Sequence, residues 1–178
     1  MTYPMTARAS AAVEIRAPRV GDIDGMLTLM APYVEVGDLL PRTPVDMLLD
    51  LPSFVIAVAA DGAVVGIGAL KRYGVHLVEV RSLAVREDYR ALGLGRAIVE
   101  RLVTHANELG VIEVFALTRR PTFFYRLGFA PASMERFPDK VWGDCARCPR
   151  RDACDEVAVH RLIAGPVATR VELAASTD

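Results

Sequence analysis

Residues 82–95, which read SLAVREDYRALGLG, constrain the fold of this chain more than any other stretch. The apolar run at residues 82–85 predicts a strand, and a short polar loop then leads through RALGLG (residues 90–95) into a long amphipathic helix. Glycines at the N-terminus of a helix allow backbone N–H groups to close around a phosphate. This order of strand, loop and helix therefore predicts an anion-binding site at the start of a helix. A plain helix entry with flexible glycines is the alternative interpretation.

The length and composition of the chain indicate one packed domain. Its 178 residues are enough for a hydrophobic core, and 52% of them are apolar. A net charge of −1 gives no electrostatic reason to expect binding to nucleic acid or to an anionic membrane surface. No apolar run approaches the roughly 18 residues that span a bilayer, so we expect no membrane partner.

The N-terminal segment and the cysteine content favour a cytoplasmic protein. Residues 1–12 lack the apolar segment of a secretory signal, and we expect a disordered leader there. Three cysteines, an odd number without such a signal, argue against a disulfide framework. We therefore expect a cytoplasmic location, a single domain at residues 13–163 and a weakly specified tail at residues 164–178.

Apolar periodicity predicts a mixed sheet flanked by helices. Asp61-Gly62 is a strong hairpin signal between two apolar strands, and Gly110 caps the end of the long helix. The predicted strands are residues 13–16, 54–60, 63–73, 76–85, 111–118, a short piece from Phe129, and 156–163. The predicted helices are residues 22–30, which Ala31-Pro32 interrupts, a short turn at 45–50, the long helix 93–109 and a short helix at 122–127. An antiparallel meander before one long helix predicts an α+β domain.

The pattern Arg90-x-x-Gly93-x-Gly95 after a strand resembles the acyl-CoA pyrophosphate loop of the GNAT acetyltransferases. The order of predicted elements also resembles the GNAT fold, a mostly antiparallel mixed sheet flanked by helices, over almost the whole chain. The resemblance implies that acetyl-CoA is the co-substrate, and it assigns the binding to Leu83, Ala84, Val85, Arg90, Ala91, Leu92, Gly93, Leu94, Gly95 and Arg96. It further implies that the N–H of Val85 polarises the acetyl carbonyl, as a small oxyanion hole does. Family members commonly form dimers, so a homodimer is expected by analogy alone.

A second match concerns proton transfer to the leaving group. Residues 123–129, FFYRLGF, resemble the terminal F-Y-x-x-G-F segment of the same family, in which a tyrosine faces the thioester sulfur. The resemblance implies that Tyr125 is the general acid for the departing thiolate. A core tyrosine without a catalytic role is the alternative.

The predicted central strand supplies a candidate base for the acceptor amine. Glu79 lies six residues before Val85, and residues an even number apart face one side of a strand unless a bulge intervenes. Glu79 would act directly or through a water molecule, and Glu113 on the next strand is the alternative. Either carboxylate could instead be a paired or edge group, with water as the proton acceptor.

Several segments narrow the resemblance to the short bacterial N-acetylglutamate synthases, single-domain enzymes of arginine biosynthesis. They are LLPR at residues 39–42, EVRSLAV at 79–85, FALT at 115–118, PTFF at 121–124 and KVWGDC at 140–145 with Cys148 and Cys154. The resemblance covers about residues 13–163. It implies that the small-molecule substrate is L-glutamate and that its α-amine attacks the thioester directly, without an acyl-enzyme.

Glutamate carries two carboxylates around one amine, so its site needs cationic groups. Arg42 and Lys71 fall on matching motifs, and Arg81 and Arg72 are further candidates. A solvated surface charge is the alternative for each of them. Two other functions stay open: a GNAT enzyme that acts on another amine, such as a protein N-terminus or an antibiotic, and a catalytically silent module that binds acyl-CoA or senses a metal.

The three cysteines form a partial metal pattern, Cys145-x2-Cys148-x5-Cys154. Structural zinc takes four ligands, and neither Asp155 nor His160 supplies a compelling fourth. The sequence therefore favours plain or redox-sensitive thiols over a zinc site. Arginines in the same loop predict lowered pKa values for these thiols.

Overall fold

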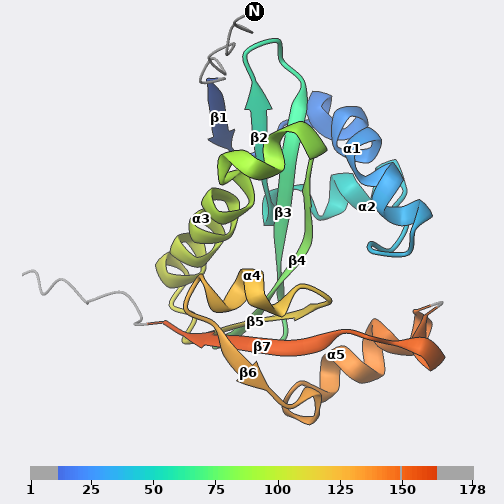
Figure 1. Cartoon of the computed structure of the whole chain (residues 1–178), viewed down its shortest axis with the longest axis vertical. Coiled ribbons are helices and arrows are strands. Elements are labelled where there is room, and N and C mark those ends of the chain that lie inside the picture. The colour runs from blue at the N-terminus through green and yellow to red at the C-terminus, as the bar shows by residue number, and fades with distance from the viewer. Residues whose placement is uncertain (1–11, 149, 164–178) are drawn as a thin grey trace, which may run out of the picture.

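The computed structural model of the chain describes residues 12–148 and 150–163 (Figure 1). The predicted leader at residues 1–12 lies outside the described residues except for residue 12, and the predicted tail at residues 164–178 lies wholly outside them. Within the described part of the chain, no helix is both long enough and apolar enough to cross a membrane.

Seven strands of the described chain form one mixed sheet. They are β1 (Val13–Arg16), β2 (Phe54–Ala59), β3 (Val64–Arg72), β4 (Leu77–Val85), β5 (Glu113–Thr118), β6 (Ala130–Ala132) and β7 (Val157–Leu162). Their order across the sheet is β1-β2-β3-β4-β5-β7-β6, and neighbouring strands are antiparallel except for β4 and β5, which are parallel. The predicted α+β architecture is confirmed.

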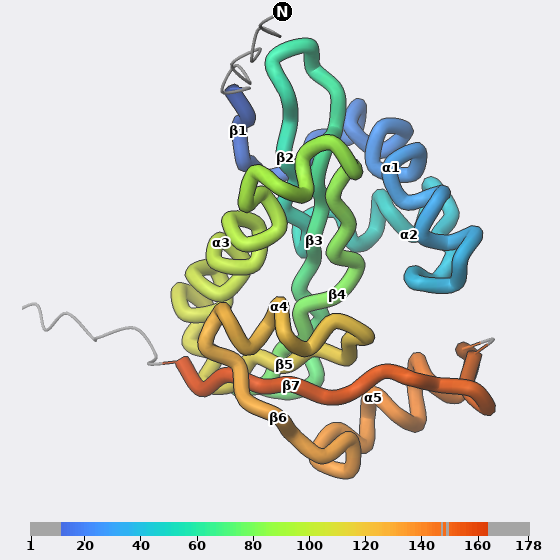
Figure 2. Tube along the Cα trace, in the orientation of Figure 1, coloured from blue at the N-terminus to red at the C-terminus, as the bar shows by residue number. Residues whose placement is uncertain are grey.

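Helices cover both faces of this sheet. They are α1 (Ile23–Glu35), α2 (Pro44–Leu49), α3 (Leu94–Glu108), α4 (Pro121–Tyr125) and α5 (Pro138–Gly143). The helix α3 lies on one side of the strands β2 to β4, and α1 and α2 lie on the other (Figures 1 and 2). A 3₁₀ turn, η3 (Glu87–Leu92), joins β4 to α3. Other short 3₁₀ turns are η1 (Val20–Asp22), η2 (Leu51–Ser53), η4 (Met134–Arg136), η5 (Cys145–Arg147) and η6 (Arg151–Ala153).

Each face of the sheet has its own hydrophobic core. On one face Ile98 and Leu102 of α3 are fully buried against the sheet. A Cβ atom added at Gly68 of β3 would lie 2.8 Å from Ile98 Cγ2 and 2.9 Å from Leu102 Cδ1, so glycine lets α3 approach the backbone closely. On the other face Met26 and Met30 of α1 are buried, among residues of α2, β2 and β3.

The strands β4 and β5 pair over only three residues and then separate. Their register joins Leu77–Glu79 to Glu113–Phe115. Beyond Glu79, therefore, the edge of β4 that faces β5 has no strand partner among the described residues. An unpaired strand edge presents N–H and C=O groups that can bind an extended ligand.

A β-bulge in β4 changes which side chains share a face. Arg81 pairs with Ala69 and Ala84 pairs with Ile67, so Ser82 and Leu83 lie opposite the single residue between them in β3. Ser82 has a φ of +53°, the left-handed conformation that such an extra residue requires. Val78 and Val80 pack in the core under α3 before the bulge, and Leu83 and Val85 pack there after it. The even spacing of Glu79 and Val85 therefore does not put their side chains on one face.

Two elements differ from the prediction. The helix α1 continues through Pro32 to Glu35, because proline in the last turns removes one N–H while the N–H of Val36 still donates to the Pro32 carbonyl. The helix α5 is not visible in the sequence pattern. Its Trp142 is 76% exposed and none of its residues is buried, so it has no apolar stripe.

Candidate active site

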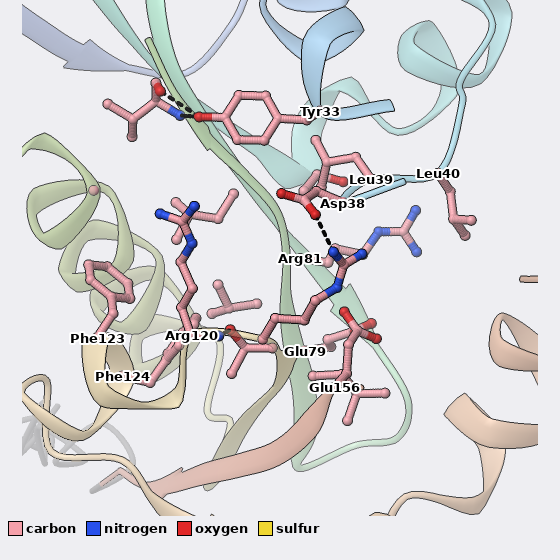
Figure 3. Close-up of a pocket in the computed structure, with 18 of the residues that line it drawn as sticks. Tyr33, Asp38, Leu39, Leu40, Glu79, Arg81, Arg120, Phe123, Phe124 and Glu156 are labelled. Carbon is pink, nitrogen blue, oxygen red and sulfur yellow. Dashed lines mark hydrogen bonds and ion pairs between the residues drawn. The ribbon is translucent and has the colours of Figure 1, made fainter. Parts of the chain in front are cut away.

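A cavity of about 640 Å³ opens where β4 and β5 separate. Its walls come from the end of α1 and the loop to α2, from β4, from the start of α3, from the end of β5 with α4, and from the segment 140–156. Figure 3 shows Tyr33 at one end of this cavity, Glu79 and Glu156 at the other, and Phe123 with Phe124 along one side. Four stretches that are far apart in the sequence therefore build one site, because β4 and the start of α3 are continuous.

The N-terminus of α3 forms one wall of the cavity. Gly93 has a φ of +77° and is the N-cap, and no side chain caps the free N–H groups of the first turn. A Cβ atom added at Gly95 would lie 3.5 Å from Phe123 and 3.6 Å from Val85, which is ordinary van der Waals contact, so packing within the protein does not require glycine here. Backbone N–H groups and the positive end of the helix dipole together make an anion site.

The residues predicted to bind acetyl-CoA divide into two groups. Those that line the cavity are Leu83, Val85, Arg90, Ala91, Gly93, Gly95 and Arg96. The side chains of Ala84 and Leu94 are buried in the two cores, and Leu92 is 51% exposed outside the cavity. These three residues can therefore contribute only through their backbone.

The Tyr33 hydroxyl is hydrogen-bonded to both the N–H and the carbonyl of Val85. The Val85 N–H donates to the Tyr33 hydroxyl at 3.0 Å, and this hydroxyl donates to the Val85 carbonyl at 2.5 Å (Figure 3). Arg90 completes the arrangement, because its Nη2 donates to Tyr33 at 3.1 Å and its Nε to the Val85 carbonyl at 3.3 Å. The N–H predicted to polarise an acetyl carbonyl is thus held by a tyrosine from α1, which the sequence analysis missed.

The helix α4 presents phenylalanine to the cavity. Phe123 and Phe124 line the cavity, whereas Tyr125 does not line it and is 40% exposed. Successive helical residues point about 100° apart, so the tyrosine after two inward residues faces away. The structure does not bring Tyr125 into the site.

Glu79 is buried at the far end of the cavity, with 3% of its surface exposed. Its Oε1 lies 2.8 Å from Lys140 Nζ, and its Oε2 accepts a hydrogen bond of 3.1 Å from Tyr73. Burial works to lower the pKa of Lys140, and the neighbouring carboxylates, Glu79 first, outweigh it and raise that pKa above its usual value. Glu79 therefore faces a charged lysine inside the protein.

Asp144 joins several side chains around the same end. It accepts hydrogen bonds from Lys71 at 2.7 and 2.8 Å, from Tyr73 at 3.0 Å, and from Arg81 and Lys140 at 3.3 Å. Burial works to raise the pKa of Asp144, but Lys71, Lys140 and Tyr73 hold it well below its usual range. Burial, together with the nearby carboxylates, raises the pKa of Tyr73 far above its usual value, so this hydroxyl remains a donor.

Of the four residues predicted to bind the substrate, two line the cavity and two do not. Arg42 and Arg81 line the cavity, and Arg42 is also bonded to the Asp50 carboxylate. Lys71 lies behind the cavity wall on Asp144, and Arg72 donates to backbone carbonyls of the β3–β4 loop.

Glu113, the alternative base, lies outside the cavity. Its Oε1 is 2.8 Å from Arg136 Nη2 and 2.7 Å from His160 Nδ1. Glu113 is thus a paired carboxylate outside the cavity, and it is no longer a candidate for the base.

The three cysteines line the cavity as free thiols. Among the described residues no group of three or more His, Cys, Asp or Glu side chains is arranged to hold a metal ion. Burial raises the pKa of Cys145, so the prediction that the basic loop lowers thiol pKa values is wrong at this residue.

Several residues that line this cavity could not be predicted from the sequence. Glu156 and Arg119 both line the cavity, and Arg119 joins Asp38 at 2.6 Å to Asp155 at 3.0 Å across its mouth. Arg150 donates to the Val36 carbonyl at 3.2 Å from the same side. No local pattern marks these residues, because each contact joins segments that are far apart in the chain or lies in a loop without periodicity.

Comparison with known proteins gives the class of the chain. Residues 26–129, more than half of it, match the family model described as the acetyltransferase (GNAT) family. An uncharacterised N-acetyltransferase of Chlorobaculum tepidum is 39% identical over 149 residues, which are 84% of this chain and 96% of that protein. The chain belongs to the GNAT acetyltransferase family.

More distant relatives have assigned activities. The amino-acid acetyltransferase of Mannheimia succiniciproducens is 31% identical over 70% of this chain, and this chain spans only 29% of that protein. A crystal structure of N-acetylglutamate synthase from Neisseria gonorrhoeae, complexed with coenzyme A and N-acetylglutamate, superposes with a TM-score of 0.76 at 27% identity, covering 87% of this chain and 36% of that one. A coenzyme A complex of Rv2747 from Mycobacterium tuberculosis gives a TM-score of 0.71 at 28% identity, covering 85% and 99% of the two chains.

Proposed function

We propose that this protein transfers the acetyl group of acetyl-CoA to the α-amine of L-glutamate. The observation that carries the proposal is a single cavity with a glycine-capped helix N-terminus in one wall and Arg42, Arg81 and Lys140 at the other end. Such a cavity accepts a ligand with a pyrophosphate on one side and an anionic acceptor on the other. The similarity to amino-acid acetyltransferases and to N-acetylglutamate synthase supports the choice of glutamate.

The donor end fits acetyl-CoA in two ways. Free N–H groups at the start of α3, with Arg90 and Arg96 beside them, would hold the pyrophosphate. The unpaired edge of β4 would pair with the amides of the pantetheine arm. The Val85 N–H becomes available to the ligand once Tyr33 moves away from it.

The acceptor end fits a small molecule with carboxylates. Arg42 and Arg81 present guanidinium groups to the cavity, and a guanidinium binds a carboxylate through paired hydrogen bonds. Asp144 fixes Arg81 and Lys140 in place through its own hydrogen bonds. Lys71 acts in this proposal through Asp144, as a positioning residue.

The reaction is a direct transfer. The neutral amine attacks the thioester carbonyl, a C–N bond forms, the C–S bond breaks, and the thiolate of coenzyme A takes up a proton. Glu79 remains the proposed base, directly or through water, in contact with Lys140.

Tyr125 remains a proposed general acid only if its ring turns into the cavity when acetyl-CoA binds. A Tyr125→Phe variant decides this, since a fall in kcat of about 100-fold keeps the role and an unchanged kcat removes it.

Release of free coenzyme A thiol, measured with a panel of amino acids, tests the proposed function. Glutamate should give a kcat/KM at least about 10-fold above glutamine, aspartate and glycine, since a carboxylate that pairs with a guanidinium contributes more than 1.4 kcal/mol. Equal values for glutamate and glycine would contradict the choice of acceptor. Tight coenzyme A binding without thiol release for any amine would favour a silent binding module.

A further inference from the structure

Glu156 lies at the point where β5 separates from β4. It directly precedes β7, whose first residue, Val157, pairs with Thr118 at the end of β5. Its side chain lines the cavity, and Figure 3 shows it beside Glu79. An acceptor that approaches a thioester held along β4 must pass this point.

The two carboxylates at this end differ in what they contact. Glu79 is buried and bonded to Lys140 and Tyr73. The carboxylate of Glu156 makes no hydrogen bond or ion pair with any residue in the described ranges 12–148 and 150–163. A half-buried carboxylate without a partner is costly unless a ligand supplies one.

The cationic side chains near Glu156 are already paired with other carboxylates, so an additional cation can bind there. Lys140 of α5, Glu79 of β4, Arg119 at the end of β5 and the adjacent Asp155 face it, with the thiol of Cys145 nearby. Arg119 is already engaged by Asp38 and Asp155, and Lys140 by Glu79. Burial raises the pKa of Glu156, and the nearby charges of Lys140 and Arg119 offset this only in part.

We infer that Glu156 binds the ammonium group of the acceptor and so sets which end of the acceptor faces the thioester. The inference rests on the proposed function for the reaction itself. It also gives the acceptor an orientation, since Arg42 and Arg81 attract its carboxylates while Glu156 and Glu79 repel them. The chemical class recognised is a primary ammonium with carboxylates on its far side. Loss of the proton precedes attack and is a separate step.

A Glu156→Gln variant tests this assignment. The KM for the acceptor should rise by about 10- to 100-fold, because a charge-assisted hydrogen bond to the ammonium is lost. The Kd of acetyl-CoA, measured by isothermal titration, should stay within about twofold, since the proposed pyrophosphate site is at the start of α3 and not at this carboxylate. A Glu156→Asp variant keeps the charge at shorter reach and should give an intermediate KM.

Asp152→Asn is the matched control, because Asp152 is an exposed carboxylate of the same segment that does not line the cavity. The KM of this variant for the acceptor should equal that of the wild type. An acceptor KM within twofold of wild type for Glu156→Gln, with the fold intact by circular dichroism, would overturn the inference. So would equal values for the Gln and Asp variants. If Glu156→Gln does not fold, Glu156→Asp alone decides, and a KM equal to wild type overturns the assignment.

A wrong choice of glutamate as the acceptor can be distinguished from a wrong role for Glu156. All amine acceptors share the ammonium, so the variants are measured with whichever amine the wild type acetylates fastest. If that amine is not glutamate, the proposed acceptor fails while the test of Glu156 stands. A wild type that acetylates no amine contradicts both.

Discussion

Gly93 shows how one backbone conformation shapes one wall of the cavity. Its φ of +77° turns the chain from η3 into α3 and exposes the first N–H groups of the helix to the cavity. An L-residue in this conformation costs about 1–2 kcal/mol. The sequence indicated this position because a glycine between a strand and an amphipathic helix allows backbone N–H groups to close around an anion.

Replacement of Gly93 by alanine should therefore weaken both the fold and the binding of the donor. We expect the free energy of unfolding to fall by about 1 kcal/mol and the Kd of acetyl-CoA to rise at least about threefold. Urea denaturation and isothermal titration measure the two effects. Gly21→Ala, at an exposed glycine without a positive φ and with no neighbour within 4 Å, is the control. Equal effects from both variants would contradict the role of the left-handed turn.

Tyr33 gives a second prediction at the scale of a residue. Its hydroxyl occupies the N–H of Val85, so acetyl-CoA must displace it to pair there. A Tyr33→Phe variant should bind acetyl-CoA about three- to tenfold more tightly, because one competing hydrogen bond is gone. An unchanged or weaker affinity would show that Tyr33 does not compete with the donor.

Single residues could be predicted where the local pattern carries the chemistry. Gly93 and Gly95 follow β4 in one continuous stretch, so their neighbours in the sequence are also their neighbours in the cavity wall. Glu79 contacts Lys140 from a distant part of the chain, and this contact could not be predicted. Tyr33 and Asp144 could not be found in this way. Their hydrogen bonds reach across 52 and up to 73 residues, and no local spacing records such contacts.

At the scale of elements, the bulge in β4 lies opposite Gly68 of β3, and both features shape the packing of the sheet under α3. The bulge turns Val85 toward the core under α3, and Gly68 lets Ile98 and Leu102 lie against the sheet at the same level. Periodicity found the strand and the helix correctly but not the bulge. Alternation in a sequence predicts faces only while the register is regular.

Gly68→Ala tests this close approach. The added Cβ atom would lie 2.8 Å from Ile98, so we expect a loss of about 1–3 kcal/mol in the free energy of unfolding. Denaturant unfolding measures it. Gly74→Ala, where the new Cβ atom would have no neighbour within 4 Å, should change stability little. A loss confined to Gly74→Ala, or none in either variant, contradicts the packing described for α3.

The helix α5 marks the limit of pattern-based prediction for elements. It is short, none of its residues is buried, and it nevertheless supplies Lys140 next to Glu79. Hydrophobic periodicity detects helices by the face that they bury. A short helix that serves to position charges leaves no such signal.

At the scale of the whole molecule, Asp144 joins distant parts of the chain. It follows α5 and is bonded to Lys71 of β3, to Tyr73 directly after that strand, and to Arg81 of β4. The pKa of Asp144 lies below its usual value of 3.8, so its charged form is favoured by folding. This contribution is complete above about pH 5 and is lost as the pH falls below 4 toward the lowered pKa.

An Asp144→Asn variant should therefore be less stable at pH 7 by about 3 kcal/mol, because it leaves buried cations without their carboxylate. The difference from wild type should shrink as the pH falls below 4. Urea unfolding at a series of pH values measures both. Asp88→Asn removes an exposed pair with Arg86 and should change the stability little at any of these pH values. A constant difference from pH 7 to pH 3 would contradict the part assigned to Asp144.

The fold and the donor end of the cavity could be predicted from the sequence, whereas the acceptor end could not be predicted in full. The donor end is one strand, one loop and one helix in succession. The acceptor end is assembled by tertiary contacts among the end of α1, β4, α5 and the segment before β7. Arg42 and Arg81 were predicted from the resemblance, but Lys140, Arg119 and Glu156 required the folded chain.

We propose that this GNAT enzyme acetylates the α-amine of glutamate. An equimolar mixture of the twenty amino acids, incubated with acetyl-CoA and the protein and analysed by mass spectrometry, compares all kcat/KM values in one reaction. We expect N-acetylglutamate to be the dominant product at early times. Acetylation of a different amino acid in preference, or no acetylated amino acid while acetyl-CoA is bound, would contradict it.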